Sequence, residues 1–172
     1  MTLNLNRQQR DEMVGGWYDL VVGGYASETE RFLREQEDPF ANPVGAALRE
    51  ELGPIVDGIL SDRDPGELGP SLDRIVRIRA LQDMPPSAAV GIILGLLQVF
   101  DKVAVDASPA ERDEFHRRVD AVLLVAFDVF DRCRQQVYDI RVKEIRNRSL
   151  KVMERLNSWR EQRAAGSPSS GT

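Results

Sequence analysis

The amino-acid sequence predicts an all-α fold, a bundle of about six helices with a long C-terminal helix that projects from it. Three observations predict this class. Every segment with clear periodicity repeats its apolar residues at intervals of three and four. No run of alternating β-branched residues is bounded by hairpin turn signals. The 172 residues are 42% apolar and 30% charged, the composition of a globular domain with one core.

Two helices are expected before residue 40. Asn6 is a good N-cap for the first, which is expected to end at the glycine pair 23–24. Ser27 stands three residues before a glutamate, the spacing of a capping box, and predicts the start of a short amphipathic helix. Its inward-facing residues are expected to be Phe32 and Leu33.

Three more helices are expected in the middle of the chain. Asn42, before a proline, predicts the N-cap of the third, and the fourth is expected from Ser71 to Pro85-Pro86. The nearly uncharged stretch 84–100 predicts a buried fifth helix capped by Ser87; it is shorter than the ~20 apolar residues that a bilayer requires, so no membrane insertion is expected. The polar face of the fourth helix carries Asp73, Arg74, Arg77 and Arg79.

The last helix is expected to be unusually long. Ser108 is a candidate N-cap, and no Pro or Gly interrupts the chain between Pro109 and Gly166. The predicted domains are therefore a bundle core (1–130), an extension of the last helix for dimer or partner contact (131–163) and a disordered tail (164–172). The core-like first half contains Phe115, Val119, Val122, Leu123, Ala126, Phe127 and Phe130. The second half has a thinner stripe of Val137, Ile140, Ile145, Val152, Leu156 and Trp159.

Charge is distributed unevenly between these segments. Residues 1–130 contain 13 Lys and Arg against 23 Asp and Glu, a balance of −10, whereas residues 131–172 contain 10 against 5, a balance of +5. This asymmetry could support acidic partners, nucleic acid or head-to-tail association. Nucleic-acid binding is not expected, because acids interleave with the basic residues, no recognition motif accompanies them and the whole chain is acidic.

The composition leaves little chemistry for catalysis. The chain has one His and one Cys, and it contains no phosphate-binding or nucleophile-elbow motif, so no enzymatic activity, cofactor or metal is expected. His116, among charged neighbours, is interpreted as a surface residue rather than a heme ligand. Cys133 is interpreted as buried, with a redox sensor as the alternative. A single thiol and a polar start, without a signal-like apolar segment, favour the cytoplasm.

Three blocks together resemble a known family. They are Asp38–Gly45 (DPFANPVG), Arg77–Gly91 (RIRALQDMPPSAAVG) and Ala126–Arg134 (AFDVFDRCR), the last running on through Tyr138–Arg146 (YDIRVKEIR). In order and spacing they resemble the N-terminal domain of RsbRD-type RsbT co-antagonist proteins, over about residues 10–157. The resemblance implies a globin-like helical domain without heme, which in full-length relatives precedes a STAS domain in stressosome-type complexes.

The resemblance also implies a function in regulation. Such domains are regarded as dimeric sensory or regulatory modules that communicate with a switch kinase. The 172 residues do not extend into a STAS domain, so by comparison with the full-length relatives this chain is expected to lack the kinase-binding and phosphorylated part. Stand-alone members are also associated with membrane-bound redox complexes of the dissimilatory sulfite reductase system, which gives a second class of partner.

The expected function is therefore that of a homodimeric protein-interaction module that signals through its last helix. A competing hypothesis is a small-ligand sensor with a cavity between residues 81–100 and 115–130. The polar residues expected at the helix contact are Arg134, Tyr138, Arg141 and Glu144. Four more residues, for which a structural role is favoured over partner contact, are Arg77, Arg79, Gln82 and Asp83. The Asp38–Gly45 block is likewise favoured as a helix-entry loop.

Overall fold

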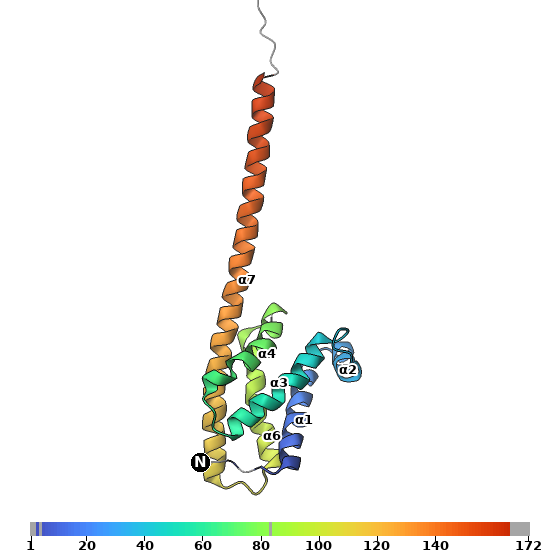
Figure 1. Cartoon of the computed structure of the whole chain (residues 1–172), viewed down its shortest axis with the longest axis vertical. Helices are drawn as coiled ribbons and strands as arrows, with labels where there is room; N and C mark the ends of the chain where they lie inside the picture. The colour runs from blue at the N-terminus through green and yellow to red at the C-terminus, as the bar shows by residue number, and fades with distance from the viewer. Residues whose placement is uncertain (1–2, 4, 83, 166–172) are drawn as a thin grey trace, which may run out of the picture. The chain divides into compact units, whose positions relative to one another are not determined.

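A computed structural model describes residues 3, 5–82 and 84–165, without the side chains of 161–165. The described residues contain helices and no strand, which confirms the predicted all-α class with its long C-terminal helix (Figure 1). The α-helices are α1 (Arg7–Gly23), α2 (Ser27–Glu35), α3 (Pro43–Leu60), α4 (Gly69–Leu81), α5 (Pro86–Val90), α6 (Gly95–Val103) and α7 (Pro109–Ala165). Two 3-10 helices, η1 (Pro65–Leu68) and η2 (Gly91–Leu94), connect neighbouring elements.

The chain divides into two units, Met1–Arg134 and Gln135–Thr172. The apolar core lies in the first unit, where buried residues run from Leu3 to Cys133. The second unit consists of the C-terminal part of α7 and the tail. The predicted disordered tail, 164–172, lies outside the described residues except for its first two positions, which are helical.

Local capping chemistry sets three of the helix starts at the predicted positions. The Asn6 side chain accepts a hydrogen bond from the Gln9 backbone N–H (2.9 Å), and the Gln9 side chain accepts one from the Asn6 N–H (3.0 Å). The Asn42 side chain accepts one from the Gly45 N–H (2.8 Å). At the start of α7, Ser108 and Glu111 form the same reciprocal pair as Asn6 and Gln9.

Helix α1 packs against both α3 and α6 (Figure 1), and Trp17 of α1 is fully buried. Its indole N–H donates a hydrogen bond to the Ile92 carbonyl (2.8 Å), so the largest core residue is also satisfied as a donor. Arg10 of α1 holds both carboxylate oxygens of Asp57 of α3 at 2.8 Å. This bidentate pair fixes α1 against α3 at the edge of the core.

The N-terminal part of α7 completes the bundle. Phe115 stacks on Phe100 of α6 with ring centroids 4.0 Å apart. The Arg118 side chain is only 4% exposed and donates to the carbonyls of Ile59 and Leu60 at the end of α3 (2.8 and 2.9 Å). A guanidinium therefore donates to carbonyl groups in the last turn of a helix, where the regular hydrogen-bond pattern ends.

Some helix-level expectations were wrong. Ala26, not Ser27, is the N-cap of α2, and it makes no side-chain cap bond. Phe32 is 46% exposed, because α2 is short and buries only Leu33. Phe127, expected in the core, is 51% exposed, since α7 turns that face away from the bundle. Arg79 does not lie on the polar face of α4 but is buried at 4% exposure.

The expected fifth helix is divided into α5, η2 and α6. Its N-cap is Pro85 rather than Ser87, and Pro86 occupies the first helical position. The window Pro86–Val103 is long and apolar enough to cross a membrane by length and composition, and a third of it is buried in the bundle. The buried residues of this window are Ala89, Val90, Ile93, Leu96, Val99 and Phe100.

Candidate functional site

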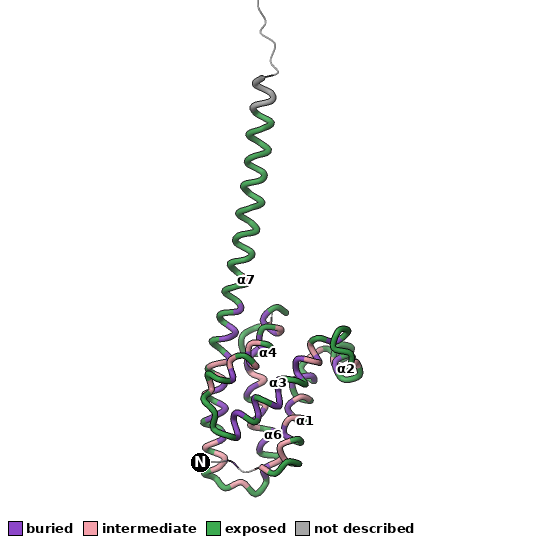
Figure 2. The backbone as a smooth tube through the Cα atoms, in the orientation of Figure 1, coloured by how far each residue is buried: buried purple, intermediate pink, exposed green. Residues whose placement is uncertain are grey.

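The C-terminal part of α7 exposes apolar side chains along its length. Among residues 135–160 only Val137 is partly buried, and every other residue is exposed. Figure 2 shows this change, since the tube of α7 has buried positions in its first part and is green beyond them. Exposed large apolar side chains in this number are typical of a helix that packs against another protein surface.

Six of these apolar residues, together with one serine, fall on one face of the helix. Their spacing alternates between four and three, which is the a and d pattern of a coiled-coil seam. We call this set the apolar stripe: Tyr138, Val142, Ile145, Ser149, Val152, Leu156 and Trp159. The six large members are 43–65% exposed. Near its C-terminal end the stripe has a shallow hollow lined by Val152, Arg155, Leu156 and Trp159, where a partner side chain could insert.

Arginines border the stripe on both sides. Arg141, Arg148 and Arg155 each precede a stripe residue, and Arg146 and Arg160 each follow one, so they occupy the positions that flank a helix–helix interface. We call these five residues the arginine flanks. All five are exposed. The face of the helix thus combines an apolar centre with cationic edges.

The four residues predicted at the helix contact have different positions. Tyr138 belongs to the apolar stripe and Arg141 to the arginine flanks, and both are exposed. Glu144 is also exposed but lies about 120° around the helix from Tyr138, at 100° per residue. Arg134 is an exposed residue at the end of the first unit. Only Tyr138 and Arg141 therefore share the stripe face within the second unit.

The residues predicted around the end of α4 also differ from one another. Arg77 is exposed and pairs with Asp73 one turn earlier (2.9 and 3.0 Å). Arg79 is buried, donates to the Ala88 carbonyl (3.1 Å) and lies over the Tyr25 ring. Gln82 is exposed and is the C-cap of α4, while Asp83 lies outside the described residues. For Arg79 this arrangement supports the favoured structural role.

The Asp38–Gly45 block connects α2 to α3. The buried Asn42 caps α3 and donates from its amide to the carbonyls of Leu33 (3.2 Å) and Gln36 (2.8 Å), both in the α2 region. This is the helix-entry role that was favoured for the block. Phe40 is 97% exposed and is the part of the block that a partner could reach.

Groups that could serve redox or metal chemistry are few. Cys133 is buried, and this burial raises the pKa of its thiol, which disfavours the reactive thiolate. His116 is exposed, as expected of a surface histidine. In the described part of the chain no three His, Cys, Asp or Glu residues are grouped as metal ligands would be.

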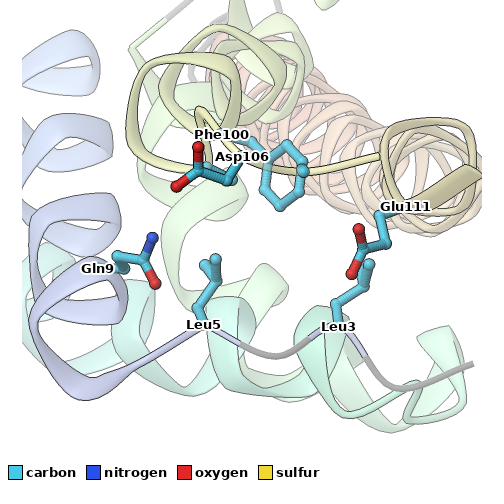
Figure 3. A pocket seen from close by; sticks show the side chains of 8 residues that line it. Leu3, Leu5, Gln9, Phe100, Asp106 and Glu111 are labelled. Atoms are coloured by element: carbon cyan, nitrogen blue, oxygen red, sulfur yellow. The ribbon is translucent and has the colours of Figure 1, made fainter. Parts of the chain in front are cut away.

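A small pocket lies between the N-terminal segment, the end of α6 and the start of α7 (Figure 3). It has a volume of about 130 Å³, enough for a few water molecules. Apolar Leu3, Leu5 and Phe100 line it together with the carboxylates of Asp106 and Glu111. The sensor cavity that the sequence suggests lies elsewhere, between residues 81–100 and 115–130, and the stacked rings of Phe100 and Phe115 lie in that region.

The sequence prediction did not include all residues of the candidate site. Val142, Ser149 and four of the five arginine flanks were not singled out as site residues. The sequence signal for them is the spacing of residues from Tyr138 onward, which alternates between four and three. One position in this series is a serine rather than an apolar residue, so the pattern is easily overlooked.

The structure defines a class of protein: an all-α helical domain whose last helix continues as an exposed amphipathic segment. The family model for the RsbT co-antagonist protein rsbRD N-terminal domain matches residues 11–145, which is more than three quarters of the chain. The chain belongs to this family, as its three sequence blocks predicted, and the family is one of regulatory domains. No curated protein and no solved structure matches the chain.

Proposed function

We propose that this chain is a non-enzymatic regulatory module that acts by protein contact through the apolar stripe of α7. One observation carries the proposal: six large apolar side chains, 43–65% exposed, share one face of a 22-residue helical segment, Tyr138–Trp159. Burying them against another surface would remove apolar area from water, which is the main driving force of protein association.

Membership of the family supports a stressosome-type regulatory setting. The proposed partners are a STAS-domain protein or a switch kinase of the RsbT type, in the cytoplasm. A subunit of a dissimilatory sulfite reductase-linked redox complex is the other partner class to test. The stripe can accept either a second copy of the chain, as a homodimer, or a helix of another protein.

The proposal is tested by placing charge on the stripe. Ile145→Glu with Leu156→Glu is expected to abolish binding of the full-length chain to whichever purified candidate partner it binds, measured by isothermal titration calorimetry, because two carboxylates cannot be desolvated in an apolar interface. The control, Asn147→Glu with Ser158→Glu, adds the same charge on the opposite side of the same helix, about 140–180° away at 100° per residue, and it is expected to bind as the unmodified chain does.

A second measurement distinguishes a second copy of the chain from another protein as the binding partner of the stripe. Light scattering on the full chain and on a version that ends at Asp131 gives different stoichiometries if the stripe forms a homodimer, and monomers in both cases if it does not. Partner binding and self-association that both persist in the stripe variant would contradict the proposed function.

A further inference from the structure

The charge beside the apolar stripe restricts what can pack on it. Residues 135–160 contain seven Lys and Arg against three Asp and Glu, a balance of +4. The charged residues at the flanking positions are the five arginines and Asp139, so the net charge of these positions alone is also +4. On the remaining faces Lys143 and Lys151 are balanced by Glu144 and Glu154. The net positive charge of this segment therefore lies next to the stripe.

These flanks disfavour a second copy as the occupant of the stripe. In a parallel pair of helices each residue before an a position faces the residue five positions later on the other helix. Arg141 would face Arg146 of the second copy, and Arg155 would face Arg160. In an antiparallel pair the residues before the a positions face one another, and from 141 to 155 these are all arginines. Both arrangements place like charges together.

We propose that the stripe binds an acidic amphipathic helix of another protein, an inference that rests on the proposed function and specifies its partner. The partner helix has apolar residues at its a and d positions and Asp or Glu at its e and g positions. The guanidinium groups of the arginine flanks bind its carboxylates, and the stripe buries its apolar face. The stripe spans 22 residues, about 32 Å at 1.5 Å per residue, so the partner helix has about three heptads.

Ser149 adds a steric preference at the centre of the stripe. Its hydroxyl donates a hydrogen bond to the Ile145 carbonyl (3.0 Å), so this polar group is satisfied within α7. The small side chain leaves room between Ile145 and Val152 for a larger one from the partner. A leucine or an aromatic residue is expected opposite Ser149, since facing large and small residues interdigitate.

The experiment uses the full-length chain and two designed peptides of three heptads. Both peptides have leucine at a and d; one has glutamate at every e and g position, and the other has lysine there. Binding is followed by the anisotropy of a dye on the peptide and by the emission of Trp159 in a Trp17→Phe background. The acidic peptide is expected to bind at least about tenfold more tightly than the basic one, and rising salt is expected to weaken its binding.

A pair of charge variants identifies the face of the helix that is used. Arg148→Glu with Arg155→Glu reverses two flanks and is expected to weaken acidic-peptide binding by about tenfold or more and to favour the basic peptide. Lys143→Glu with Lys151→Glu changes the net charge by the same amount on the other side of the helix and is expected to weaken binding by less than about twofold. Circular dichroism checks that both variants retain the same helix content.

Each other outcome overturns the inference. A chain that is dimeric by light scattering, and becomes monomeric in the Ile145→Glu, Leu156→Glu variant, keeps the proposed function but makes a second copy the occupant. Tighter binding to phosphatidylglycerol vesicles or to duplex DNA than to the acidic peptide, abolished by the flank reversal, replaces the helix by an anionic surface. A monomer that binds none of these probes contradicts both the inference and the proposed function.

Discussion

Arg118 and Glu114 show how one buried cation is accommodated in the bundle. Arg118 donates from Nε to Glu114 (2.8 Å) and from Nη1 to two carbonyls at the end of α3, and its Nε lies 3.2 Å from the Asp62 carboxylate. Glu114 also accepts two hydrogen bonds from Arg117 (2.6 and 2.9 Å). The guanidinium groups of Arg117 and Arg118 lower the pKa of Glu114 to about 2.

This shift predicts a loss of stability in acid. Since the pKa of Glu114 is lower in the folded chain than its ordinary value, its contribution is present above about pH 4.5 and is lost as the pH falls towards 2. Glu114→Gln is expected to lower the urea midpoint at pH 7 and to reduce its decline between pH 4.5 and 2. Asp113→Asn, at an exposed neighbouring position, is the control. An unchanged pH profile in Glu114→Gln would contradict this account.

At the scale of the helices, the sequence block with the clearest structural role is Asp38–Gly45, which contains the N-cap of α3. Asn42 is 1% exposed and joins α2 to α3 through three hydrogen bonds. Gly45 makes this geometry possible, because a Cβ on it would lie 2.2 Å from the Asn42 amide nitrogen. A glycine three residues after the cap is therefore required by the close approach of the capping side chain.

Two glycine substitutions test this interpretation. Gly45→Ala is expected to displace the Asn42 side chain and to lower the free energy of unfolding by about 1–2 kcal/mol, the usual cost of losing an N-cap. Gly15→Ala, inside α1 with open space around the new methyl group, is expected to raise it by about 0.5–1 kcal/mol. Urea unfolding followed by circular dichroism measures both. Equal effects of the two substitutions would show that the cap contact contributes nothing.

The helices also show which features could be predicted from sequence. The caps Asn6, Asn42 and Ser108 were predicted because capping depends on a few neighbouring residues. The exposure of Phe32 and Phe127 and the burial of Arg79 were not, because each depends on which neighbouring elements cover a helix face. The division of residues 86–103 into α5, η2 and α6 was likewise not predicted, because the apolar residues of this segment suit a continuous helix as well.

At the scale of the whole chain, the change in character along α7 was predictable and the full candidate site was not. The thinning of apolar residues after Phe130 and the reversal of charge are both visible in the sequence. The apolar stripe was found only in part, because periodicity alone does not say which exposed residues share one face until the helix is known to be continuous to Ala165. Tyr138 and Arg141 are exposed on the stripe face, and their contact with a partner stays a prediction.

The two units are expected to contribute differently to the free energy of unfolding. The core residues from Leu3 to Cys133 all lie in the first unit, whereas residues 135–160 are exposed, apart from the partly buried Val137. Deleting residues 135–172 is therefore expected to change the free energy of unfolding by no more than about 0.5 kcal/mol, as for surface changes generally. Urea unfolding followed by the fluorescence of buried Trp17 measures this, with full-length Trp159→Phe as the reference, so that both chains carry one tryptophan.

The same deletion distinguishes a structural role of the helix from a role in contact. If the segment exists to bind a partner, the truncated chain keeps its urea midpoint and loses binding of the acidic peptide, and adding that peptide raises the midpoint of the full-length chain alone. A free energy of unfolding that falls by several kcal/mol on truncation would mean that residues 135–160 stabilise the bundle directly. The exposure of the stripe would then not be evidence of a binding surface, so this measurement should precede the search for partners.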